Sequence, residues 1–246
     1  MACRRDRRGG LSDMEKLKPM VKLLKRCGFF ICVHLAPPSI PGSAWLKAGD
    51  IIELEPDKVA HVNGGTTSSS WEEIKTVIDQ SRAGIELIPE GNAVKFIKTL
   101  EYLASRKELH RVVFGSDAPT GACSLPGAMN KAIVKAASLA GIPAPQAIAM
   151  ATGNTARLYG LSVGEIRAGR EADLVVIDAP PGCEGEDALS AIEVGDLFGC
   201  SLVVADGRIR ASRGRDTRAT RRVCSINGAA YAPKDIHEFL YNPPML

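Results

Sequence analysis

Four short apolar runs alternate with helical patterns in the first half of the chain, and this alternation constrains the fold most. The runs are continuous in hydrophobicity, which is typical of strands that are covered on both faces. They lie at residues 28–35, 57–64, 83–89 and 111–118. Strands that alternate with helices in this way predict an α/β fold with a parallel sheet.

The segments between and after these runs have the spacing of amphipathic helices, and their ends carry capping signals. The predicted helices are residues 70–82, 92–108 and 126–140. Ser70 followed by Glu73 predicts a capping box. Asn92 caps the second helix, while Pro126 and Gly141 mark the start and end of the third.

The ends of the predicted strands recur with an almost constant spacing, and three of the four carry a polar residue. His61 follows His34 by 27 residues, Pro89 follows His61 by 28, and Asp117 follows Pro89 by 28. A repeat of this length, with one strand end per repeat, matches a (β/α) barrel. The active site of such a barrel gathers at the C-terminal ends of its strands.

The pattern changes beyond Gly141. Two short helices are predicted in "PAPQAIAMAT" and "GNTARLYG", the second capped by Asn154 and ended by Gly160. "GEIRAGREADLVVIDAP" and "GCSLVVADGRIRAS" then predict strands joined by turns, hence a small β module. The expected domains are a basic N-terminus at 1–18, a partial barrel at 19–160, a β-sandwich segment at 161–212 and an Arg-rich tail at 213–246.

Composition argues against several classes of function. A net charge of +3 is too small to indicate nucleic acid, and the seven arginines between residues 208 and 222 are interpreted as a solvated edge. No apolar run approaches the ~18 residues of a membrane span, and "MACRRDRRGG" does not have the pattern of a secretory signal. Seven scattered cysteines without a C-x-x-C pair indicate reduced thiols, so a cytoplasmic location is expected.

The two strand-end histidines and the strand-end carboxylate suggest metal chemistry. Converging imidazoles favour a metal such as zinc or iron(II), and Asp117 adds an oxygen ligand or a base. Taken singly, each has a structural explanation: His34 and His61 as core residues, Asp117 as a loop cap. Cys32 lies about 6.5 Å deeper on the strand than His34 and is interpreted as a packing residue.

The loop "HVNGG" after the second strand is a candidate substrate contact. Gly64 and Gly65 allow main chain to approach a ligand closely, and Asn63 adds a polar side chain beside them. An ordinary strand-to-helix turn explains the same letters equally well.

As a set, the motifs resemble the amidohydrolase superfamily of metal-dependent hydrolases. The segments that carry the resemblance are "FFICVH", "SIPGS", "AHVNGG", "VVFGSDAP", "MATGNTARLYGL" and "GEIRAGREADLVVID". The resemblance implies the C-terminal half of a (β/α)8 barrel of TIM type followed by a small β-sandwich. Within the superfamily, the combination is most similar to hydrolases that open a cyclic amide.

The resemblance also implies roles for single residues. His34 and His61 match the fifth-strand and sixth-strand histidines that bind one metal. Asp117 matches the eighth-strand aspartate, which binds the second metal and shuttles the proton. The implied cofactor is a binuclear centre of zinc, iron(II) or both, and the implied substrate is a small cyclic amide attacked by metal-activated water.

The sequence departs from the family pattern at its beginning. The family opens its barrel with an H-x-H pair on the first strand, and this sequence contains no H-x-H. The chain is therefore expected to start near the fifth strand and to be truncated relative to the family. Two interpretations stay open: a metal-dependent hydrolase, or a catalytically inactive half-barrel that serves as a binding or scaffold protein. Open strand edges also predict self-association.

Overall fold

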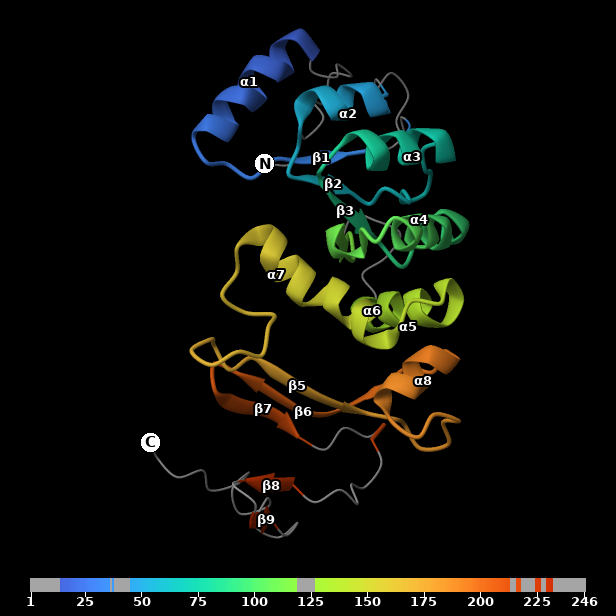
Figure 1. Cartoon of the computed structure of the whole chain (residues 1–246), viewed down its shortest axis with the longest axis vertical. Helices are drawn as coiled ribbons and strands as arrows, with labels where there is room; N and C mark the ends of the chain where they lie inside the picture. The colour runs from blue at the N-terminus through green and yellow to red at the C-terminus, as the bar shows by residue number, and fades with distance from the viewer. Residues whose placement is uncertain are drawn as a thin grey trace.

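The computed structural model describes residues 14–35, 37, 45–118, 127–212, 216–217, 224–226 and 229–231 (Figure 1). The predictions for the N-terminus, for the loop around Pro126 and for most of the Arg-rich tail lie outside these residues. Within them, no helix is both long and apolar enough to cross a membrane.

Helices and strands alternate along the chain up to α5. The helices α6 and α7 and an antiparallel sheet follow. In chain order they are α1 (Met14–Arg26), β1 (Cys32–His34), α2 (Ala48–Leu54), β2 (Lys58–Ala60), α3 (Trp71–Gln80), β3 (Gly84–Leu87), α4 (Ala93–Ser105), the 3-10 turn η1 (Leu109–Arg111), β4 (Val112–Phe114), α5 (Ala128–Ala140), α6 (Ala144–Ala151), α7 (Gly153–Tyr159), β5 (Leu174–Asp178), α8 (Ala188–Val194), β6 (Gly199–Ala205), β7 (Arg208–Ser212), β8 (Cys224–Ile226) and β9 (Ala229–Tyr231).

The predicted parallel sheet is confirmed. Its strands lie in the order β1-β2-β3-β4, and every neighbouring pair is parallel. Val33, Val59, Ile85 and Val112 occupy one row of the register. The helices α2, α3, α4 and α5 follow one another beside the sheet in the same order as the strands (Figure 1).

The two faces of this sheet differ in chemistry, because successive side chains of a strand point to opposite sides. One face is apolar and fully buried against the helices, with Val33, Val59, Ile85 and Leu87 in the main hydrophobic core. The other face carries polar groups in the alternate positions, which are Cys32, His34, Lys58 and Glu86. The polar face is the one that a barrel would enclose.

The capping predictions are confirmed in part. Ser70 accepts a hydrogen bond from the main chain of Glu73, and Asn92 caps α4 in the same way. The Glu73 carboxylate, however, accepts from the main-chain N–H of Ala48, so it links α3 to α2 in place of completing a capping box.

The prediction that Asn154 caps α7 is wrong. Thr152 precedes the helix as its N-cap, and Asn154 lies inside it. The buried amide of Asn154 donates to the carbonyl oxygens of Leu109 at 3.0 Å and Val112 at 2.9 Å. This side chain therefore ties α7 to the start of β4.

The predicted β module is present as a three-stranded antiparallel sheet in the order β5-β6-β7. Asp206 and Gly207 form its β6–β7 turn, and both have positive φ, at 54° and 64°. This is the conformation that a tight hairpin turn requires. Strands β8 and β9 pair separately.

We expect the isolated chain to self-associate. Within the described residues β1 pairs only with β2, and β5 exposes Val175 at 57%. A strand edge without a partner favours pairing with another chain, and each recovered backbone hydrogen bond contributes about 1 kcal/mol. Light scattering after size exclusion at micromolar concentration should show dimers or larger species.

Variants identify the surface that is responsible. Val175→Lys should shift the population toward monomer, because an edge lysine opposes strand pairing. Val194→Lys on α8, also at an exposed position of 53%, is the matched control and should leave the association unchanged. A wild-type chain that stays monomeric and melts cooperatively would contradict the prediction.

Candidate functional site

The strand-end residues singled out in the sequence lie at one edge of the parallel sheet. His34 is the last residue of β1, His61 follows β2 directly, and Asp117 comes three positions after β4. Since the strands are parallel, their C-terminal ends point the same way. The edge therefore collects two imidazoles and a carboxylate from three strands.

His34 and His61 face each other in direct contact. His34 Nδ1 lies 2.5 Å from His61 Nε2, the ring centroids are 4.5 Å apart, and the ring planes meet at 54°. His61 is buried, with 8% of its surface exposed. One ring nitrogen of each residue thus points into the same small space.

The surroundings favour neutral imidazole at His34. Burial lowers the pKa of His34 below its ordinary value, and the neighbouring His61 lowers the pKa further. The negative charge of Asp117 acts in the opposite direction and raises the pKa of His34, but its effect is smaller than those of burial and His61. Neutral imidazole is the form that binds metals.

Asp117 sits on a tight backbone turn beside the second-strand loop. Its φ is 52°, in the left-handed region that few residues other than glycine adopt. A Cβ placed on Gly65 would lie 4.0 Å from Asp117 Oδ2, so the carboxylate faces this glycine.

The loop that contains Asn63, Gly64 and Gly65 is held firmly by its own contacts. Asn63 is fully buried, donating through Nδ2 to Ile88 O at 2.9 Å and accepting at Oδ1 from Ile88 N at 3.0 Å. Gly64 has a φ of 73°, and a Cβ there would meet Thr67 O at 2.1 Å. The Asn63 amide thus joins this loop to the end of β3.

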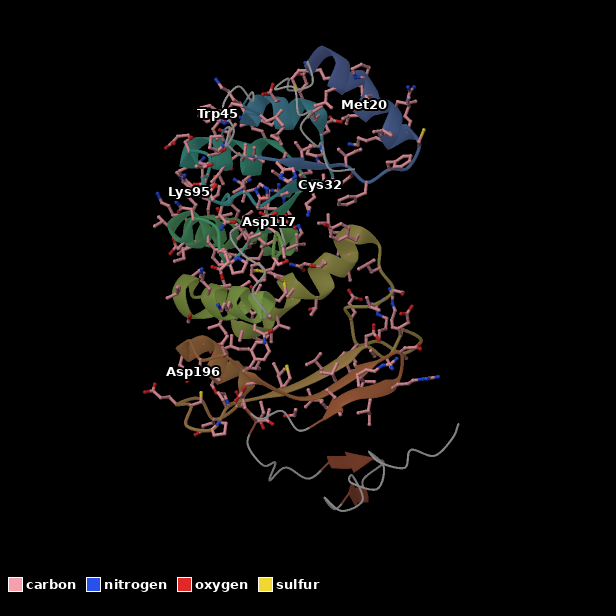
Figure 2. All side chains as sticks on the ribbon, turned by 180° about the vertical axis from the view of Figure 1, so that it is seen from behind. Met20, Cys32, Trp45, Lys95, Asp117 and Asp196 are labelled. Atoms are coloured by element: carbon pink, nitrogen blue, oxygen red, sulfur yellow. The ribbon has the colours of Figure 1, made fainter. Side chains whose placement is uncertain are left out.

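The lysine labelled Lys95 in Figure 2 fixes the far side of the same loop. Its Nζ donates to Ser68 Oγ at 2.7 Å and to the main-chain oxygen of Ser69. The backbone from His61 to Ser69 is therefore anchored both to β3 and to α4. Such anchoring gives the histidine and the two glycines defined positions at the sheet edge.

Replacing Asn63 by Ala should destabilise the fold by about 2–4 kcal/mol, because a buried N–H and a buried carbonyl of Ile88 lose their partners. Urea denaturation followed by circular dichroism measures this free energy. Asn92→Ala, which removes an exposed helix cap, is the control and should cost about 1 kcal/mol. An equal loss in the two variants would contradict a bracing role for the Asn63 amide.

Two charged residues on the polar face of the sheet were not identified from the sequence. Lys58 Nζ and Glu86 Oε1 form an ion pair at 2.6 Å, with side-chain exposures of 8% and 16%. Burial alone would lower the pKa of Lys58, but the charge and hydrogen bond of Glu86 outweigh this effect and raise it. A lysine and a glutamate of opposite charge in adjacent apolar strands are the signal that could have identified the pair.

Cys32 lies next to this pair on the same face. Burial raises the pKa of its thiol, so Cys32 stays protonated. A protonated, half-buried thiol is a poor metal ligand. The interpretation of Cys32 as a packing residue agrees with this environment.

The residues present match a metal site in donor type, but they supply only part of one. Two imidazole nitrogens converge, as the ligands of zinc or iron(II) do. Among the described residues no group of three His, Cys, Asp or Glu side chains is placed to hold a metal ion. The pair of histidines therefore offers two ligands, where a closed zinc site uses about four.

Comparison with known proteins agrees with the motifs. A sequence profile described as "Amidohydrolase family" matches residues 13–210. Enamidase from Eubacterium barkeri is 37% identical over 222 residues, which cover 89% of this chain and 56% of enamidase. The chain thus spans little more than half the length of this relative.

Solved structures show the same relation. The crystal structure of enamidase superposes with a TM-score of 0.81 at 36% identity, covering 86% of this chain and 55% of enamidase. A beta-aspartyl dipeptidase from Fervidobacterium islandicum matches with a TM-score of 0.58 at 17% identity, covering 88% of this chain and 59% of its own. The second likeness concerns the fold alone.

Proposed function

Because this chain belongs to the amidohydrolase family, we propose that it forms the site of a metal-dependent hydrolase acting on a small cyclic amide. The bond broken is a carbon–nitrogen bond outside a peptide. Enamidase, 37% identical, supports this substrate class through the enamide that its name denotes.

The contact between His34 Nδ1 and His61 Nε2 carries the proposal. Two imidazoles from adjacent parallel strands, His61 buried and His34 partly buried, converge at the C-terminal edge of the sheet, where barrel enzymes keep their catalytic groups. In this proposal both histidines hold a divalent metal. Such a metal, when bound, lowers the pKa of a water molecule toward neutrality and polarises the amide carbonyl.

Asp117 is the proton carrier of the proposed reaction. Its carboxylate takes the proton of the attacking water as oxygen bonds to the amide carbon. The same carboxylate then donates that proton to the ring nitrogen as the carbon–nitrogen bond breaks. Gly65, which faces the carboxylate, leaves room for substrate on this side.

We expect zinc to bind the isolated chain at His34 and His61, but weakly, because two ligands are fewer than the roughly four of a closed zinc site. Nitrogen NMR of the histidine rings should show zinc-dependent shifts at both residues, and dialysis should remove the metal. The variant His61→Ala should lose the zinc-dependent shift at His34. The control is His110→Ala, a histidine just before β4, and it should keep the shifts at His34 and His61. Zinc that survives dialysis would mean that further ligands complete the site.

Activity is tested by adding the portion of enamidase that this chain does not cover. Hydrolysis of a cyclic enamide should need both parts and added zinc, iron(II) or manganese, and neither part alone should exceed the metal-containing blank. A folded, metal-loaded assembly without turnover would oppose the hydrolase proposal. That result would favour a binding or scaffold role.

A further inference from the structure

The Glu86 carboxylate reaches across the polar face of the sheet to the main chain of His61. Oε2 accepts a hydrogen bond from the His61 N–H at 3.1 Å, while Oε1 is paired with Lys58 at 2.6 Å. The main-chain oxygen of Glu86 also accepts from the Val62 N–H at 2.9 Å. Two successive N–H groups at the end of β2 thus depend on this single residue of β3.

The backbone of His61 needs such support, since its φ of 33° lies in the left-handed region. A residue other than glycine held there costs of order 1–3 kcal/mol and persists only where its surroundings fix it. The turn that follows is tight, with Gly64 N donating to His61 O at 2.6 Å. Glu86 fixes the N-terminal side of this turn.

The imidazole of His61 lacks the usual means of orientation. A metal-binding histidine normally donates its second ring N–H to a carboxylate or carbonyl group, which sets the direction of the ring. His61 Nδ1 is buried, and no hydrogen-bond partner for it is found in the described part of the chain. Apart from the contact of Nε2 with His34, the direction of the His61 ring therefore depends on the main chain that carries it.

We infer that Glu86 is a positioning residue for His61: its carboxylate, balanced by Lys58, holds the backbone that aims the ring at His34. The inference rests on the proposed function, because it concerns the same histidine pair. Glu86 acts through the His61 main chain, which distinguishes it from a metal ligand.

Gly115 makes room for this arrangement. A Cβ on Gly115 would lie 2.5 Å from Glu86 Oε1. The residue directly after β4 thus has no side chain, and the carboxylate occupies that space. Gly115→Ala should displace the carboxylate while leaving the acid in the protein.

The test compares ring contacts in the metal-free chain. Nuclear Overhauser effects between the ring protons of His34 and His61 should be strong in the wild type and lost in Glu86→Ala. Gly115→Ala should weaken the same Overhauser effects at least twofold. If Glu86→Ala does not fold, this second variant tests the inference. With zinc added, Glu86→Ala should bind about tenfold more weakly than the wild type.

The control is a similar ion pair at the other end of β4. Arg111 and Glu108 are 2.6 Å apart with side-chain exposures of 11% and 24%, and they do not touch His61. Glu108→Ala should preserve the ring effects and bind zinc within twofold of the wild type. A general loosening of the fold would affect this control as well.

The outcomes separate the positioning role of Glu86 from the proposed metal site. Unchanged ring effects in folded Glu86→Ala or Gly115→Ala would overturn the inference, and so would equal losses in Glu108→Ala. Loss confined to the Glu86 and Gly115 variants would support it even if the wild type bound no zinc. Absence of zinc binding in the wild type would overturn only the metal site of the proposed function.

Discussion

Replacing Asp117 by Asn is expected to lower cyclic-amide hydrolysis by about a thousandfold in the assembly of this chain with the uncovered portion of enamidase. Asparagine keeps the size of the side chain and one carbonyl oxygen, but it cannot accept the proton of the attacking water. It also cannot deliver a proton to the leaving nitrogen. Initial rates with saturating metal measure the effect.

Two controls make the result specific. Asp79→Asn changes an exposed carboxylate of α3 that pairs with Lys75 at 2.7 Å, and it should leave the rate within twofold. Nitrogen NMR should show that His34 and His61 still respond to zinc in Asp117→Asn. A rate close to that of the wild type would mean that Asp117 does not carry the proton.

Replacing Phe96 by Ala should destabilise the chain by about 3–5 kcal/mol, the largest effect expected for a single core substitution. Phe96 of α4 is fully buried and stacks on Phe114 of β4 with ring centroids 5.8 Å apart. Its removal leaves a cavity where the helix layer meets the last strand of the parallel sheet. Because small domains are stable by roughly 5–15 kcal/mol, the variant should be close to unfolding at room temperature.

Urea denaturation followed by the fluorescence of the two tryptophans, Trp45 and Trp71, measures this loss. Val94 lies on the same helix with 67% of its surface exposed, so Val94→Ala is the matched control. The control should change the free energy of unfolding by less than about 0.5 kcal/mol. A loss below 1 kcal/mol in Phe96→Ala would mean that α4 and β4 do not belong to one cooperative unit.

Much of the fold could be predicted from the sequence, because the strands of the parallel sheet are buried on both faces. Burial makes each of them a continuous apolar run, and the repeat of 27 or 28 residues matches the succession of strands in a (β/α) barrel. The helices α1, α2 and α8 were missed. Helix α1 contains Pro19, a residue that normally interrupts helices, and α2 starts after Lys47, a poor capping residue by type.

The candidate site could be predicted less completely. The spacing of His34, His61 and Asp117 indicated that they share an edge, since only the ends of parallel strands had to be placed. The contact between Glu86 and the His61 main chain depends on a left-handed turn, which the letters around a histidine do not indicate. That Glu86 contacts the main chain of His61, and not its ring, can therefore be learned only from the structure.

The alternation of faces in β1 and β2 has a consequence for how such a chain can change over generations. Val33 and Val59 serve the core, while Cys32 and His34 of β1 and Lys58 of β2 face the other side. In a library of single substitutions selected only for folding, the number of residue types accepted at each position should therefore alternate along these strands. It should be low at the positions that face the core and higher at the positions between them. New ligands or new substrates can then be explored at one set of positions while the adjacent set keeps the protein folded.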